Sequence, residues 1–427
     1  PEAILGNYTE DNPLTWYSYP VVGWPVDFQF VEYQYPIPGA QPIHLIWTDT
    51  PCWTTCWNGG NKMIEALRSE KIECIIAQHP WMENDCLFAD IILPIDTKLE
   101  EEDIAVDASN GSYWLLLYEG KCIPSRGESM SDYEAVGEIA KKLGLYEQYT
   151  QGRTIEEWIR KGFEESGVAA KISYEEFRQK GYYVVPTRAN WEENPAGFEL
   201  FCKDPENNPL PTPTGKIEFY STNLAEYFPD DEERKPYPRY IPYGKTHQES
   251  LQHPRSEKYP FLIVSNHPRW RVHAQLDDIP WLREIPTCKV TGPDGYQYEP
   301  VWINPKDAAK LGVGDGDVVK IYNDRGWVLG GVYVTERIMP GVVYQDHGAR
   351  LDPIVLGESD RGGANNLICP SATTSSNCPG EVTSGYLVAV EPVDVHELSK
   401  KYPEAFNRVY DKGIGVSFRN WIKEEEK

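Results

Sequence analysis

Short apolar runs that end in polar loops dominate the first third of the chain. Three of them have the length and composition of buried parallel strands, at 42–48, 73–77 and 91–93. A helix is predicted between the first two, over 63–69. Strand, helix and strand in this order are typical of the end of an open α/β sheet, in which ligands lie beyond the carboxyl ends of the strands. Those ends are 48–50, 78–80 and 94–97, and ordinary polar loops remain the alternative reading of them.

The middle of the chain predicts helices and then loops. Residues 131–143 have apolar side chains on one helical face, and Ser131 can cap the helix. Further predicted elements are a strand at 113–118, helices at 154–166 and 173–179, and a short strand at 217–221. A polar, proline-rich stretch from 225 to 255 marks a domain boundary.

Beyond residue 259 the pattern changes to many short β-rich runs separated by turns. Strands are predicted at 261–264, 318–322, 327–335, 342–346 and 385–393. One short helix is predicted at 304–312. Many short strands with a single helix indicate a small closed barrel.

A loop rich in hydrogen-bond donors follows the strand 261–264. The donors and rings of this loop are Asn266, His267, Arg269, Trp270, Arg271 and His273. Arginine offers a fork of donors that suits phosphate, and tryptophan offers a flat face. The alternative is a surface loop whose arginines are solvated or paired with Asp277 and Asp278.

Composition narrows the class of protein. The 427 residues carry a net charge of −25, which argues against general binding to nucleic acid or anionic membranes. No apolar run approaches the length of a membrane span. The nine cysteines include no CxxC pair, so reduced thiols are the simpler interpretation. Cys52 and Cys56 can share a helical turn, but two thiols alone are weak evidence for a metal site.

Several motifs resemble a known family. FADIILP (88–94) with the acids at 100–103, TPTGKIEFYS (212–221) and INPKDAAKLGVGDGDVVKIYNDRGWV (303–328) resemble the molybdopterin oxidoreductases of the dimethyl sulfoxide reductase superfamily. Within it, GKCIPSRGESMSDYE (120–134), KGYYVVP (180–186) and SDRGGANNL (359–367) resemble the large subunits of pyrogallol–phloroglucinol transhydroxylases and related polyphenol hydroxylases and dehydroxylases.

The resemblance implies an α/β fold in which a Rossmann-like domain is followed by a double-psi β-barrel. Residues 42–145 would be the C-terminal part of the molybdopterin oxidoreductase domain, and 256–427 the dinucleotide-binding barrel. Residues 1–41 would form an irregular approach segment and 146–255 a helical, proline-rich connection.

The cofactors that the resemblance implies are two molybdopterin guanine dinucleotides that chelate Mo or W. One dinucleotide would be lined by Trp47, Thr48, Asp49, Gln78, His79 and Asp96, and Asp96 would accept hydrogen bonds from guanine. The pterin or phosphate of the other would be held by Asn266, His267, Arg269, Trp270, Arg271 and His273. Matching barrel loops add His347, Asn365, Asn366 and Tyr386.

Two departures from the family limit this interpretation. The cluster cysteines and the metal ligand of the family lie in an N-terminal half that this sequence does not contain, so the sequence predicts a part of a longer polypeptide. An iron–sulfur cluster would then belong to that missing part or to a partner subunit. The loop 107–114 is shorter than in transhydroxylases and has no cysteine. Its Asn110, Ser112 and Tyr113 are candidates to face substrate, although a plain turn is favoured.

The predicted function is the C-terminal part of an enzyme that transfers hydroxyl or oxygen groups, or electrons, on a small substrate of the polyphenol class. The alternatives are another substrate or an oxyanion, a non-catalytic cofactor-binding chain, and a plain sugar- or nucleotide-binding protein. Partners would be the N-terminal remainder and an iron–sulfur electron-transfer subunit, with no nucleic acid and no membrane span. The expected compartment is the cytoplasm, with export by a twin-arginine signal left open, and no catalytic residue is assigned.

Overall fold

The computed structural model describes all of the chain except 19–30, 51, 83, 108–113, 188, 194–196, 245–248, 375–379 and 418–427. It divides into two compact units. The first consists of Pro1–Ala77, Met82–Ile91 and Ser221–Lys427, and the second of Gln78–Trp81 and Ile92–Tyr220. Asn110, Ser112 and Tyr113 lie outside the described residues.

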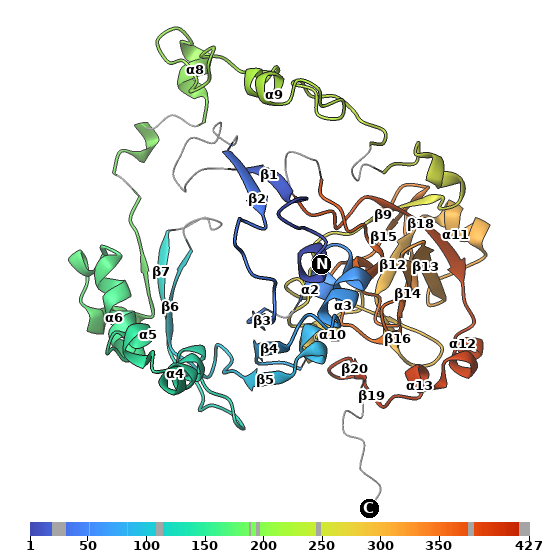
Figure 1. Ribbon diagram of the computed structural model, residues 1–427, viewed down its shortest axis with the longest axis horizontal. Coiled ribbons are helices and arrows are strands. Elements are labelled where there is room, and N and C mark those ends of the chain that lie inside the picture. The colour runs from blue at the N-terminus through green and yellow to red at the C-terminus, as the bar shows by residue number, and fades with distance from the viewer. Residues whose placement is uncertain are drawn as a thin grey trace, which may run out of the picture. The chain divides into compact units, whose positions relative to one another are not determined.

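A closed six-stranded barrel forms the core of the first unit (Figure 1). Its strands are β9 (Phe261–Val264), β12 (Pro300–Ile303), β13 (Val318–Asn323), β14 (Gly326–Val334), β15 (Val342–Tyr344) and β18 (Tyr386–Pro392). The order is β12–β15–β9–β18–β13–β14, and β14 closes the ring by pairing in parallel with β12. The strands β16 (Pro353–Val355) and β17 (Ser359–Asp360) continue from β14. The predicted small barrel is confirmed.

Alternation of side chains explains how these strands close around a core. In β13, Val319 and Ile321 are fully buried, whereas Lys320 and Tyr322 point away. β14 is buried on both faces, and Gly330 lets its neighbour approach, because a Cβ there would lie 2.2 Å from Val301 Cγ2. The α11 helix (Pro305–Leu311) packs Ala308 into the same core and ends at Gly312, as the sequence predicts.

An α/β layer precedes the barrel in the chain. The strands β3 (Leu45–Thr48), β4 (Cys74–His79) and β5 (Ile91–Pro94) form a three-stranded sheet in that order, and β3 pairs with β4 in parallel. The helices α2 (Trp53–Cys56) and α3 (Gly60–Leu67) connect β3 to β4, and α3 buries Met63, Ile64, Ala66 and Leu67. This is the predicted end of an open α/β sheet. The division between the two units passes through β4 and β5.

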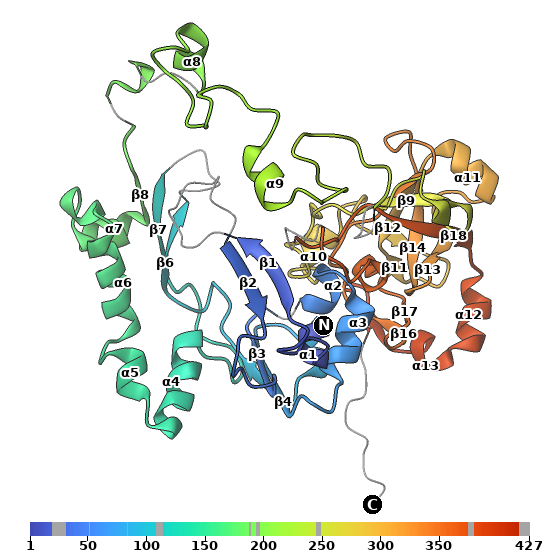
Figure 2. The same ribbon diagram turned by 45° about the horizontal axis from the view of Figure 1, so that its top comes forward.

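The second unit combines an antiparallel sheet with a group of helices (Figure 2). The strands are β6 (Asp103–Asp107), β7 (Leu115–Glu119) and β8 (Tyr182–Val184), and the helices are α4 (Asp132–Leu143), α5 (Tyr146–Thr150), α6 (Ile155–Glu165) and α7 (Tyr174–Lys180). Leu116, Ile159, Phe163 and Phe177 form its core. Ser131 caps α4 in a capping box with Glu134, as predicted.

Two predictions about local structure are wrong. The segment 1–41, predicted to be irregular, contains α1 (Glu2–Leu5) and an antiparallel pair, β1 (Leu14–Ser18) with β2 (Val31–Tyr35). Cross-strand aromatic contact, such as Trp16 on Tyr33 at 5.9 Å, stabilises that pair. The predicted strand 217–221 does not form, since no described strand pairs with it and the side chain of Phe219 is 74% exposed.

The remaining elements are short and lie mostly on connecting segments. They are α8 (Glu199–Lys203) in the second unit, and α9 (Thr222–Tyr227), α10 (Pro280–Arg283), α12 (Val395–Lys401), α13 (Pro403–Phe406), β10 (Val290–Thr291), β11 (Gln297–Tyr298), β19 (Tyr410–Asp411) and β20 (Val416–Ser417) in the first. Among the described residues, no helix combines the length and the apolar character that crossing a membrane requires.

We expect Ile321→Ala to destabilise the first unit by about 2–4 kcal/mol, because it leaves a cavity in a core where Ile321 is fully buried. Denaturant unfolding followed by tryptophan fluorescence measures the loss. Lys320→Ala is the matched control on the outer face of β13 and should cost less than about 1 kcal/mol. Equal losses in the two variants would contradict the assignment of Ile321 to the barrel core.

Candidate functional site

The donor-rich loop after β9 is held at both of its ends. The backbone N–H of Ser265 donates to Ser384 Oγ at 3.0 Å, and the N–H of His347 donates to the carbonyl of Asn266 at 3.3 Å. Val272 and Gln275 close the far end with mutual backbone hydrogen bonds of 3.1 and 2.8 Å. The loop therefore has a fixed path beside the segment that follows β15.

Arg271 is the buried anchor of this loop. Its Nη1 donates to Glu299 at 2.8 Å and to Asp277 at 3.2 Å. Its Nη2 donates to the carbonyl of His347 at 2.7 Å, and its Nε donates to the carbonyl of His273 at 3.2 Å. The side chain is fully buried. Four of its five N–H donors are therefore used inside the protein, and its contact with a ligand stays a prediction.

Three cations converge on Asp277. Lys289 and Arg283 lie 3.0 and 3.2 Å from its carboxylate, in addition to Arg271. Burial alone would raise the pKa of Asp277, but the charges of Lys289, Arg271 and Arg283 hold that pKa well below its usual range. Asp277 therefore stays ionised in the folded protein, and the pairing alternative considered for the arginines holds for Arg271.

Arg269, two residues earlier, points the other way. It is exposed, and no ion pair or side-chain hydrogen bond joins it to another described residue. It lines a cavity of about 360 Å³ that Asn266, His267 and Trp270 also line, so the structure brings these four predicted residues together.

The far wall of this cavity comes from the barrel and was not predicted. Trp302, Tyr333, Tyr344, Arg337 and Asp346 contribute to it. Trp302 packs on Tyr344 and Tyr333, with ring centroids 4.9 and 5.7 Å apart. Burial and the contact with Asp346 raise the pKa of the Tyr344 hydroxyl. No local sequence signal marks these strand residues, because they alternate like any barrel position.

Three imidazole rings meet next to the cavity. The ring centroids of His267, His273 and His347 are 4.6, 4.7 and 5.2 Å apart, and His273 Nδ1 lies 3.1 Å from His347 Nε2. Burial and the neighbouring His267 and His273 lower the pKa of His347 to about 4, and burial followed by His267 lowers the pKa of His273. Both rings are therefore neutral near neutral pH, and their nitrogens are available as ligands or acceptors.

Cys56 completes this cluster from a distant part of the sequence. Its Sγ and one nitrogen each of His273 and His347 all lie within 4.8 Å of one another. A hydrogen bond with Cys52, together with burial, raises the pKa of the Cys56 thiol. Sequence reasoning noticed the two thiols on one turn but had no signal that histidines would join them.

An unusual backbone conformation brings His273 close to the segment that carries His347. His273 has a positive φ of 53°, which is a strained conformation for a non-glycine residue. Its carbonyl passes so close to Gly348 that a Cβ there would lie 2.1 Å from the oxygen. Glycine at 348 therefore permits the close approach of the two histidine segments.

Three predicted contact residues are internal instead. Asn365, Asn366 and Tyr386 are each fully buried. Asn365 donates to the carbonyls of residues 345 and 346, Asn366 donates to the carbonyl of Cys56 at 2.8 Å, and the Tyr386 hydroxyl donates to the carbonyl of Asn365 at 2.8 Å. In this structure they hold the walls of the site together, and their contact with a cofactor stays a prediction.

The residues at the strand ends that were predicted to line one dinucleotide are divided between the two units. Trp47, Thr48 and Asp49 end β3 in the first unit, where Thr48 is buried and Trp47 is 40% exposed. In the second unit, Gln78 and His79 are buried at the end of β4, and the Gln78 amide donates to Asp132.

Asp96 also belongs to the second unit. Its two carboxylate oxygens accept hydroxyl hydrogen bonds of 2.7 Å from Ser125 and Ser129, and Lys121 lies 4.0 Å away. Asp96 thus anchors the loop 125–129. Guanine could use only the remaining lone pairs of this carboxylate, and the predicted contact stays a prediction.

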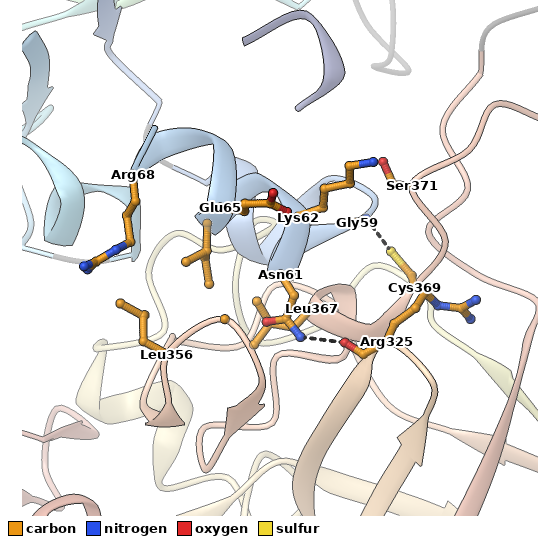
Figure 3. Close-up of a pocket in the computed structure, with 12 residues that line it drawn as sticks. Gly59, Asn61, Lys62, Glu65, Arg68, Arg325, Leu356, Leu367, Cys369 and Ser371 are labelled. Atoms are coloured by element: carbon orange, nitrogen blue, oxygen red, sulfur yellow. Dashed lines mark hydrogen bonds between the residues drawn. The ribbon is translucent and has the colours of Figure 1, made fainter. Parts of the chain in front are cut away.

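A larger cavity of about 730 Å³ lies between α3 and the loops of the barrel (Figure 3). Most of the cationic side chains that line it are bound to other groups of the protein. Lys62 pairs with Glu2 at 2.6 Å, and Arg325 Nε donates to the carbonyl of Ile368 at 2.7 Å. Arg68 lies on the opposite side of the view from Lys62. The cavity therefore offers no converging set of donors, and the site beside Arg269 is the stronger candidate.

Comparison with known proteins gives a consistent result. Residues 261–382 match the family model described as Molydopterin dinucleotide binding domain. The chain is 31% identical to the pyrogallol hydroxytransferase large subunit of Pelobacter acidigallici over 92% of this chain and 48% of that protein. It is 34% identical to dimethyl sulfoxide reductase DmsA of Escherichia coli (strain K12) over 82% of this chain and 42% of that protein.

Among solved structures, acetylene hydratase from Pelobacter acetylenicus has a similar fold, with a TM-score of 0.55 and 16% identity over 83% of this chain and 45% of that chain. The chain spans about half the length of the curated relatives it matches.

We expect Gly348→Ala to displace the His273 segment, because the added methyl group meets the His273 carbonyl at 2.1 Å and φ is +76°. The expected loss of unfolding free energy is about 2–4 kcal/mol, with shifted histidine ring signals in NMR spectra. Gly357→Ala is the control: its φ is +80°, but its nearest neighbour is 3.9 Å away. If Gly348→Ala lost no more unfolding free energy than the control, the close approach of Gly348 to the His273 carbonyl would not be needed for stability.

We expect acid to weaken the Arg271–Asp277 network. The pKa of Asp277 is lower in the folded than in the unfolded state, so the unfolded state binds more protons as the pH falls below about 4. The stability that Asp277 contributes is therefore present above that pH and is lost below it.

Asp277→Asn tests this in thermal unfolding between pH 3 and 7. The variant should lose about 3–5 kcal/mol at neutral pH, because it leaves buried cations without their partner, and should show a shallower loss below about pH 4. Asp11→Asn, at an exposed position, should change neither the stability at neutral pH nor its loss in acid. An unchanged acid slope in Asp277→Asn would remove this carboxylate from the network.

Proposed function

The chain belongs to the dimethyl sulfoxide reductase family, and from that premise we propose that it is the cofactor-holding part of a molybdenum or tungsten enzyme. The chain would bind molybdopterin guanine dinucleotide, two copies per enzyme, and would orient it. When bound, the cofactor supplies the metal centre that transfers oxygen or hydroxyl groups or electrons. The observation that carries the proposal is the cavity beside Arg269, which lies inside the matched domain.

The chemistry of this cavity fits a phosphorylated, planar cofactor. The guanidinium groups of Arg269 and Arg337 are exposed and form no ion pair with a carboxylate among the described residues, so they are available to phosphate oxygens. The rings of Trp270 and Trp302 offer apolar faces to a flat heterocycle. The volume of about 360 Å³ admits one part of a dinucleotide rather than all of it.

The chain's own residues would then act by positioning. Arg269 and Arg337 hold the phosphates, Asn266 and His267 hydrogen-bond the heterocycle, and Arg271 keeps the loop rigid from below. At the strand ends, Trp47, Thr48, Asp49, Gln78, His79 and Asp96 are the proposed contacts of the second dinucleotide. Rigid placement of these groups lowers the entropic cost of holding the metal in one geometry.

The substrate we propose first is a polyphenol that gains, loses or exchanges a hydroxyl group. The relative that covers most of this chain is named a pyrogallol hydroxytransferase, and the similarity reaches over 92% of the chain. The second candidate is reduction of an S-oxide, because the identity to a dimethyl sulfoxide reductase is 34%. The barrel alone serves both reactions, so it does not discriminate between them.

The activity would require further polypeptide. We propose that the metal ligand comes from an N-terminal remainder of the enzyme, because no metal ligand of the family is identified in this sequence. A separate iron–sulfur subunit is the proposed electron-transfer partner, in line with a relative that is named a large subunit. The cytoplasm is the proposed compartment.

We expect Arg269→Ala and Arg337→Ala each to lower the amount of guanine nucleotide that the protein retains after dialysis by at least about tenfold. The reason is that each substitution removes a charged phosphate contact. Guanine nucleotide released by acid from the purified full-length protein is measured by chromatography and mass spectrometry.

The matched control is Arg68→Ala, which removes an exposed arginine of the same unit at the other cavity. Full nucleotide content in both cavity variants, or equal loss in the control, would remove the proposed cofactor site. Turnover of pyrogallol and of dimethyl sulfoxide by the full-length protein separates the two substrate candidates, and activity on the S-oxide alone would contradict the polyphenol proposal.

A further inference from the structure

We propose that Cys56, His273 and His347 form a binding site for a divalent transition-metal ion of borderline softness, with Zn²⁺ as the best fit. This ion is distinct from the metal that the pterin cofactor carries. The proposal takes His273 and His347, which the resemblance implied for the cofactor, as ligands of the ion instead, whereas Arg269, Arg337, Trp270 and Trp302 remain the proposed cofactor contacts.

The three ligand atoms are close enough to share one ion. Three atoms no more than 4.8 Å apart always fit within about 2.8 Å of a common centre. Zinc bonds are about 2.0–2.1 Å to imidazole nitrogen and 2.3 Å to thiolate sulfur, so small side-chain rotations complete the contact. The separation of 3.1 Å between His273 Nδ1 and His347 Nε2 already matches two neighbouring vertices of a tetrahedral site.

The donor set selects the kind of metal. One thiolate and two imidazoles suit zinc and related ions, whereas calcium and magnesium prefer oxygen ligands. The carboxylates of Asp277 and Glu299 are paired with Arg271 and Lys289. The carboxylate of Asp85, which acts on the Cys56 thiol, accepts hydrogen bonds from Trp53 and Thr54. None of the three is therefore free to compete as a ligand. The site therefore offers soft donors without a surplus of oxygen donors.

The surrounding scaffold holds all three ligands in place. Arg271 donates to the carbonyls of both histidines. The N–H of Gly348 donates to the carbonyl of Thr55 at 3.0 Å, and Asn366 donates to the carbonyl of Cys56 at 2.8 Å. These bonds tie the three segments together before any ion arrives, as a preorganised site requires.

A fourth donor is available next to the three. The Cys52 thiol hydrogen-bonds Cys56. Cys52 completes a tetrahedron, or a small ligand from solvent does so. His273 is exposed, so an ion can enter from solvent.

Binding is a simple exchange of a proton for the ion. The Sγ–H bond of Cys56 breaks, the proton leaves to solvent, and an Sγ–metal bond forms. The two imidazoles contribute lone pairs and release no proton. No electron is transferred, so no oxidant or reductant is needed.

Co²⁺ is the probe of choice, because it substitutes for Zn²⁺ and absorbs visible light. The purified full-length protein is freed of loosely bound metal by a chelator and is then titrated with Co²⁺. We expect one further equivalent to bind, with the strong visible bands of a tetrahedral site and a sulfur-to-cobalt charge-transfer band in the near ultraviolet. Zn²⁺ should displace it.

The variants Cys56→Ser and His273→Gln test the ligands. Cys56→Ser should abolish the charge-transfer band, and His273→Gln should weaken Co²⁺ binding by at least about tenfold. His273 is exposed, so its variant should fold normally even where Cys56→Ser does not. Cys122→Ser and His396→Gln alter the same residue types outside the cluster and should bind Co²⁺ like the parent protein.

Two results would overturn the proposal. One is a folded protein that shows no tetrahedral Co²⁺ spectrum. The other is a spectrum and affinity that His273→Gln and Cys56→Ser both leave unchanged. Guanine nucleotide is measured in the same samples: its loss from Arg269→Ala with the Co²⁺ spectrum intact supports two separate sites, and joint loss of both in that variant counts against them.

Discussion

The buried guanidinium of Arg271 is the interaction on which the candidate site depends. It is an ion surrounded by protein, and it is tolerated because Glu299 and Asp277 lie within 3.2 Å of it. Breaking such a buried pair costs more than forming it gains, since a single charge is then left without compensation. The same guanidinium also donates to the carbonyls of His273 and His347. The ion pair thereby fixes the backbone from which both imidazoles project, including the strained φ of His273.

Two arginines in one short loop have opposite tasks for this reason. Arg271 donates its hydrogen bonds to buried groups of the protein, whereas Arg269, two positions earlier, lines the cavity. Neither task is possible without the other: a loop without the buried anchor would not present Arg269 in one place, and a second outward arginine would leave Asp277 and Glu299 with fewer cationic partners. An exchange of Arg271 for lysine would lose the fork that reaches two acids and two carbonyls at once.

The pattern of apolar and polar residues predicted the secondary-structure elements that depend only on residues close in the sequence. The capped helix after Ser131 and the barrel strands β9, β13, β14, β15 and β18 follow from local periodicity, and the structure has them, whereas β12 was not predicted. The donor-rich loop was also found, because its composition is unusual. Composition did not show which donors are consumed internally: Arg271, Asn365, Asn366 and Tyr386 have the same chemistry whether buried or exposed, and only the fold decides. The meeting of Cys56 with His273 and His347 was missed, since segments so far apart in the chain carry no local signal of contact.

The loop brings together two environments that favour opposite charges. On the Arg269 side, two guanidinium groups that form no ion pair with a described acidic residue make the cavity attractive to anions. On the His273 side, the positive charge of Arg271 is paired with Asp277 and Glu299, but it still helps to lower the pKa of His347, after burial, His267 and His273. The softness of the thiol and imidazole donors decides which ion they suit. The anchor that separates the two environments would therefore allow one loop to bind both the proposed anionic cofactor and the proposed metal ion.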